Sequence, residues 1–207
     1  MQQYPKPPRV MPVANLQEYF HDALQDALMH QKVAVEDQTE HYVVNLLTLF
    51  ARSENLFEPS ADGVRIKPLV QMLSEALEAP TTGERERGLQ RLGDVSLFVA
   101  GFFAHSFARK LIDIDYHIAM GGRAYGTLAC GLARGRQRVL SQVFGELAEK
   151  FLPVVEALWE IADSSRSYTQ ADVLRLYEIW LKTGSARARG LLRQLGLEAT
   201  PVPLAQN

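Results

Sequence analysis

Apolar and polar positions alternate at helical spacing along most of the chain. The apolar positions between 16 and 28 form one stripe, which predicts an amphipathic helix that ends near Lys32. A second helix is predicted over residues 37–52, and its nearly continuous apolar composition places it deep in the protein. Because only residues 33–36 connect the two, we expect an antiparallel helical hairpin.

Residues 95–108 contain no charged side chain, and their apolar residues cover every side of a helix. A helix that is apolar all round is a buried one, so residues 89–110 are predicted to form the central helix. Residues 115–134 form the second member of a central pair. Its small residues share one face, which we expect to pack closely against the first helix: Ala119, Gly122, Gly126 and Cys130. Cys130 is interpreted as a small buried hydrophobic residue.

Shorter helices complete the prediction. One begins near Pro68 and stops at Pro80, and another runs from about Gly135 to Asp163 with a kink near residues 149–153 at Pro153. Two more lead up to Gly196, whereas the strand-like residues 64–66 have no obvious partner. The sequence therefore predicts an all-α, single-domain helical bundle of about eight helices around the buried pair 89–110 and 115–134. The expected organisation is a proline-rich arm (1–14), a helical domain (15–196) and a tail (197–207).

Composition narrows the classes of function. The 207 residues suit one domain, and 47% hydrophobic with 22% charged residues is ordinary for a globular protein. A net charge of −2 argues against a general nucleic-acid binder. The N-terminus lacks the order of a signal peptide, and no uncharged apolar run reaches the roughly 18 residues of a membrane span, so we expect a cytoplasmic protein without a membrane partner.

The candidate site consists of polar residues that interrupt the two central helices: Asp94, His105, Arg109, Asp113, Asp115, His117 and Arg123. Two interpretations stay open. These residues form a structural network of aspartate–arginine pairs, with Arg109 paired to Asp113, or to Asp94 or Asp115 if the helix breaks first. Alternatively, they line a ligand pocket.

Metal binding and catalysis are weakly indicated. Residues 113, 115 and 117 offer oxygen and nitrogen ligands for a divalent metal, but residues two apart share a face only in an extended chain. The sequence contains no Gly-x-Ser-x-Gly elbow, and the glycine-rich residues 121–126 follow no predicted strand and lack the Lys-Ser/Thr of a phosphate loop. We therefore predict no metal, no cofactor and no catalytic residue.

Three segments carry a resemblance to known proteins. Residues 92–103 read LGDxSLFxxGFF, residues 115–126 read DYxxxMGxxAYG, and residues 39–47 read TEHYxVNLL. Together they resemble a widespread group of uncharacterised bacterial proteins. The resemblance implies a bacterial source and one domain, and it brings no function with it.

The leading functional interpretation is a non-catalytic helical interaction or regulatory module that self-associates or binds a protein partner. Its alternative is a small-molecule- or metal-binding protein, possibly an enzyme, with a polar pocket at the junction of the two central helices. Nucleic-acid binding through the arginine-rich C-terminal helix is the least favoured.

Overall fold

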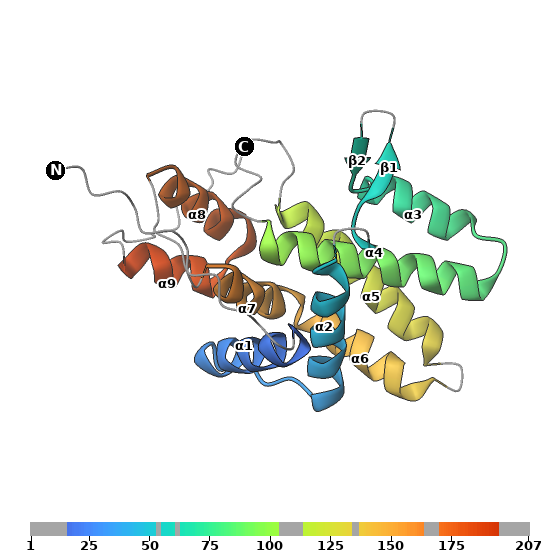
Figure 1. Cartoon of the computed structure of the whole chain (residues 1–207), viewed down its shortest axis with the longest axis horizontal. Coiled ribbons are helices and arrows are strands. Elements are labelled where there is room, and N and C mark those ends of the chain that lie inside the picture. Colours follow the sequence, from blue (N-terminus) through green and yellow to red (C-terminus); the bar gives the residue numbers. More distant parts are fainter. Residues whose placement is uncertain are drawn as a thin grey trace, which may run out of the picture.

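The computed structural model describes residues 16–52, 55–60, 63–103, 114–133, 137–163 and 170–194 (Figure 1). Helices within these ranges contain more than half of the chain, and one short hairpin is the only strand structure there. The predicted all-α class is confirmed. The predicted arm (1–14) and tail (197–207) lie outside the described residues.

The described ranges hold nine helices and two strands. In chain order they are α1 (Leu16–His30), α2 (Asp37–Phe50), β1 (Glu58–Ser60), β2 (Gly63–Arg65), α3 (Leu69–Glu78), α4 (Thr82–Phe102), α5 (Ile114–Leu132), α6 (Arg138–Glu149), α7 (Phe151–Asp163), α8 (Gln170–Thr183) and α9 (Ala186–Gln194). The strand-like segment does have a partner, because β2 pairs with β1 in antiparallel register, Glu58 opposite Arg65.

The central helix α4 is shifted relative to its predicted range. It begins at Thr82 instead of residue 89, and it ends at Phe102 instead of residue 110. The early start follows from the N-cap residue Thr81. The Thr81 hydroxyl oxygen accepts from the Glu84 backbone N–H at 3.2 Å, and the same hydroxyl lies 2.8 Å from the Glu84 carboxylate. The charged residues after Thr82 thus form the exposed first turns of the helix.

The buried character of α4 is as predicted. Every residue from Leu92 to Gly101 is buried, because α4 packs against α5, α3, α7 and α2. Figure 1 shows α4 and α5 running through the middle of the molecule, with α3 and the hairpin at one end and α8 and α9 at the other. Near the C-terminal end of α4, the Ala100 carbonyl accepts from the Trp159 ring N–H at 2.6 Å.

The prediction that the small-residue face of α5 packs closely against α4 is wrong in the residues it names. Gly122 and Gly126 face Ala148 and Phe151 on the α6–α7 side at ordinary contact distance, and Cys130 is exposed. The close approach to α4 is made one residue earlier on α5 and by α4 itself. A Cβ at Gly121 would lie 2.7 Å from Ser96 Cβ, and a Cβ at Gly93 would lie 2.6 Å from Tyr125 Cδ1.

The predicted kink near residues 149–153 is confirmed as a break between two helices. Lys150 separates α6 from α7, and Pro153 is the third residue of α7. A proline in the first helical turn leaves no hydrogen bond unmade, because the N–H groups there have no partner within the helix. One predicted helix therefore becomes two, which accounts for nine helices where about eight were expected.

The two kinds of glycine predict opposite effects of the same substitution. Gly93→Ala should lower the free energy of unfolding by about 1–3 kcal/mol, because the Tyr125 ring has no room to retreat. Gly126→Ala should be neutral or raise it by about 0.5–1 kcal/mol, since its Cβ would lie 3.7 Å from Ala148 Cβ and glycine is unfavourable inside a helix. Urea denaturation of both variants checks this, and equal effects would contradict the packing.

Candidate functional site

The predicted site residues do not come together as one group. His105, Arg109 and Asp113 lie outside the described residues, so the predicted Arg109 pairing stays a prediction. The remaining four occupy α4 and α5, where Asp94 is buried and Arg123 is exposed. Their surroundings are therefore described one at a time.

Asp94 is the centre of a buried polar cluster. Its Oδ1 accepts hydrogen bonds from the hydroxyl groups of Tyr42 on α2 and Tyr125 on α5, each at 2.7 Å. The Gln90 side-chain amide donates to the Tyr42 oxygen at 2.9 Å. Among the described residues, the side-chain hydrogen-bond partners of Asp94 are thus two tyrosines. This cluster joins three helices through one carboxylate oxygen.

Burial dominates the electrostatics of this cluster. Removal from water raises the pKa of Asp94 from 3.8 to about 6, although the two tyrosine hydrogen bonds and the nearby Arg91 charge oppose the rise. Burial and the adjacent carboxylate also raise the pKa of Tyr42 and Tyr125 well above the usual range, so both hydroxyls remain donors. With Tyr125 fully buried and Asp94 8% exposed, the cluster is enclosed by protein.

The three predicted residues on α5 point to different surroundings. Asp115 is half-buried, His117 is buried and Arg123 is exposed. Burial lowers the pKa of His117 to about 4, so its ring is neutral near pH 7. His117 precedes Tyr125 by eight residues, about 12 Å along a helix, which separates it from the Asp94 cluster. No three His, Cys, Asp or Glu side chains in the described part of the chain are placed to hold a metal ion.

The raised pKa of Asp94 predicts a specific dependence of stability on pH. The folded protein binds this proton more tightly than the unfolded chain, so the stabilisation is complete below pH 3.8 and is lost as pH rises through about 6. The total is about 3 kcal/mol, of which about 1.4 kcal/mol is lost between about pH 5 and about pH 7.5.

Asp94→Asn cannot ionise and still offers an oxygen to both tyrosines. Its free energy of unfolding relative to wild type should therefore rise by about 1.4 kcal/mol between those two pH values. Urea denaturation at each pH measures the difference. A difference that stays constant with pH would show that Asp94 does not titrate in this range.

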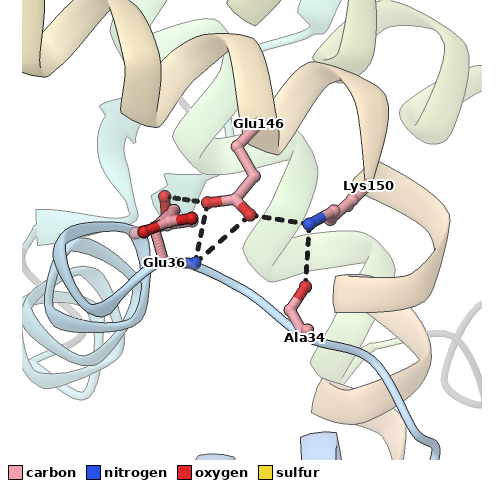
Figure 2. Close-up of polar contacts among 5 residues, drawn as sticks. Ala34, Glu36, Glu146 and Lys150 are labelled. Carbon is pink, nitrogen blue, oxygen red and sulfur yellow. Dashed lines mark hydrogen bonds and ion pairs between the residues drawn. The ribbon is translucent and has the colours of Figure 1, made fainter.

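A second carboxylate, Glu146, ties α6 to the beginning of α2 (Figure 2). The Glu36 backbone N–H donates to both of its oxygens, at 3.2 and 3.1 Å, and the Thr39 hydroxyl donates at 2.5 Å. Lys150 completes the cluster by donating to Glu146 at 2.7 Å and to the Ala34 carbonyl at 2.8 Å. Since Glu36 is the N-cap of α2 and its own side chain makes no capping bond, Glu146 supplies the cap from another helix.

Partial burial alone would raise the pKa of Glu146, but the bonds from Lys150, Thr39 and the Glu36 backbone outweigh it and lower the pKa. The stabilisation from this group is therefore present above its ordinary pKa of 4.5 and is lost as pH falls, opposite in sign to that of Asp94.

Removal of this tie should be measurable. Glu146→Ala leaves the Glu36 N–H and the Thr39 hydroxyl without their acceptor and removes the ion pair of Lys150. We therefore expect a loss of about 1–2 kcal/mol in the free energy of unfolding. Glu149→Ala, an exposed carboxylate on the same helix, is the matched control and should change it by less than about 0.5 kcal/mol. Equal effects in thermal or urea denaturation would argue against the cap.

A third polar cluster lines a cleft of about 420 Å³ between the end of α1, α7 and the beginning of α9. Glu160 on α7 accepts from His30 at 2.8 Å, from Gln31 at 3.1 Å and from Arg187 at 2.9 Å. Although partial burial acts to raise the pKa of Glu160, these neighbours lower it, so the carboxylate is ionised near neutral pH. Val33, Pro153 and Leu191 line the same cleft with apolar surface.

Glu156, which lines this cleft, is a buried residue with 6% of its surface exposed. Burial raises its pKa, opposed by the Ser185 hydroxyl and by the backbone N–H groups and charge at the start of α9. One of its oxygens, Oε1, has no hydrogen-bond partner among the described residues. The same is true of Oε1 of Gln31 and Nε of Arg187. Three polar atoms around one cleft are thus buried without a partner, which is costly unless something else satisfies them.

One feature of the sequence could have predicted this cluster. Glu156 is the single acid within the apolar stretch 151–159, which is the pattern of a buried charge that needs partners. The partners of Glu146 and Glu160 could not be identified from the sequence, because both carboxylates reach segments more than 100 residues away.

Comparison of the chain with models of protein families, with curated proteins and with solved structures finds no match. The resemblance to uncharacterised bacterial proteins therefore stays an expectation. Within the described ranges, no helix has both the length and the apolar character that crossing a membrane requires.

Proposed function

We propose that the protein is a non-catalytic helical interaction module that self-associates through the outer face of α3. The observation that carries this proposal is the second apolar face of that helix. Leu69, Met72 and Ala76 are buried where α3 packs against α4. Val70 and Leu77 remain 64% and 53% exposed on the outer side.

The outer face has the spacing of a helix-pairing surface. Val70, Ser74 and Leu77 recur at i, i+4 and i+7, with the half-buried Leu73 beside them. The small Ser74 lies between the two aliphatic residues and allows another helix to approach. In an antiparallel pair of α3 helices centred near Ser74, Val70 of each copy would lie opposite Leu77 of the other, as in an isologous dimer interface.

The charges of α3 favour a second copy in that orientation. The first turn holds no acid and the last turn holds no base, so neither end of the helix dipole is offset within the helix. Arg65 instead precedes the helix and Glu78 is its last residue, whereas Lys67 and Glu75 pair with each other within one chain at 3.0 Å. An antiparallel copy would bring Glu78 of one helix toward Arg65 of the other at both ends of the interface.

The alternative expectation, a ligand pocket at the junction of the central helices, gains no support from Asp94. Its carboxylate is enclosed by Tyr42 and Tyr125 and faces protein. The rest of that junction, residues 104–113, lies outside the described residues.

Sedimentation equilibrium over a range of protein concentrations tests the proposed self-association. We expect the wild type to dimerise and Leu77→Glu to remain monomeric with unchanged helicity, because Leu77 is exposed in the single chain. Leu181→Glu is the matched control, since Leu181 on α8 is 51% exposed and lies outside the proposed interface. A monomeric wild type, or equal loss of dimer in both variants, would refute the proposal.

A further inference from the structure

The cleft between α1, α7 and α9 has the features of a built binding site, and its evidence is independent of the α3 interface. Its volume of about 420 Å³ lies within the range of small-molecule sites. Its lining combines a few polar groups at one place with apolar side chains beside them, which is the usual composition of such sites. Three polar atoms around the cleft have no hydrogen-bond partner in the described part of the chain, and the partners they require indicate the chemistry of the ligand.

The three unpartnered atoms require different hydrogen-bonding groups on a ligand. The carbonyl oxygen of Gln31 and Oε1 of Glu156 are acceptors, so each requires a donor. The Nε–H of Arg187 is a donor and requires an acceptor. A ligand that satisfies all three must therefore carry N–H or O–H donors together with an acceptor oxygen.

The charges around the cleft restrict the class of ligand further. Two carboxylates, Glu156 and Glu160, and one guanidinium, Arg187, border the cleft. A cationic donor would be attracted to Glu156, whose Oε1 has no hydrogen-bond partner among the described residues, and an anionic acceptor would be attracted to Arg187. A purely cationic ligand would leave the Arg187 N–H unsatisfied, and a purely anionic ligand would leave Glu156 and Gln31 unsatisfied.

We infer that this cleft binds a small zwitterion of the amino-acid type, its ammonium group donating to Glu156 and Gln31 and its carboxylate accepting from Arg187. The apolar lining from Val33, Pro153 and Leu191 suits an aliphatic side chain on that ligand. Glu160 acts as a positioning residue, because it holds His30, Gln31 and Arg187 around the opening through its three hydrogen bonds.

Gly190 offers a way to close the cleft without disturbing the fold. It lines the cleft, and a Cβ added there meets no atom within 4 Å. A larger side chain at this position would therefore occupy open space, and it replaces glycine inside a helix by a better helix former. Gly190→Leu should keep the protein folded while filling the binding space.

Isothermal titration calorimetry of the full chain with three matched probes tests the inference. L-leucine carries both charged groups, 3-methylbutylamine lacks the carboxylate, and 4-methylpentanoate lacks the ammonium group. We expect saturable binding of L-leucine and at least tenfold weaker binding of each truncated probe. No saturable binding of L-leucine, or equal binding of either truncated probe, would overturn the inference.

Variants place the binding in this cleft. Glu156→Gln should weaken L-leucine binding at least tenfold and Gly190→Leu should abolish it, whereas Glu149→Gln, an exposed carboxylate outside the cleft, should bind as wild type. Circular dichroism and thermal denaturation of each variant confirm that it is folded. If Glu156→Gln does not fold, Gly190→Leu decides alone: unchanged binding in that folded variant would show that the ligand binds elsewhere.

Discussion

The fit of Tyr125 against Gly93 fixes the arrangement of the central helices. Because Gly93 has no side chain, the ring lies directly on the α4 backbone, and its hydroxyl reaches Asp94 one residue further along. The other side of the ring stacks on Phe144, with the ring centres 5.4 Å apart. One side chain thus sets the distance between α4 and α5 and supports α6 beyond them. A shift of either helix would break a buried hydrogen bond and the ring contact together.

Carboxylates at helix junctions carry opposite electrostatic balances in this protein. Asp94 and Glu156 are so deeply buried that loss of water outweighs their partners, and their pKa values rise. Glu146 and Glu160 keep enough solvent and enough donors for the pKa to fall. The two classes have different consequences. Donors that are fixed by the fold satisfy Glu146 completely, whereas Glu156 retains an oxygen without a partner, and so only the latter has capacity for an additional ligand.

The sequence was informative where one physical rule acts locally. Apolar periodicity located nearly every helix, and Pro153 located the break between α6 and α7. The sequence was misleading about which residues of a helix face its neighbour, because this depends on how the helix is rotated about its axis. Gly121 and Gly122 are adjacent, yet only the first faces α4, because neighbouring residues point about 100° apart on a helix. Likewise Asp94 was recognised as unusual, but its tyrosine partners come from positions 42 and 125, a pairing that no local pattern contains.

The carboxylate ties of α6 and α7 also have a kinetic meaning. Glu146 binds the chain at residue 36 and Glu160 binds it at residue 30, across sequence separations of 110 and 130 residues. Contacts of that range close large loops and form only after both partners are structured, whereas α4, α5 and α6 meet through short connections. Among the described elements, we therefore expect the α1–α2 hairpin to dock late during folding. By the same reasoning we expect it to open more readily than α4, so that its amide hydrogens exchange with solvent through a smaller unfolding event than those of α4.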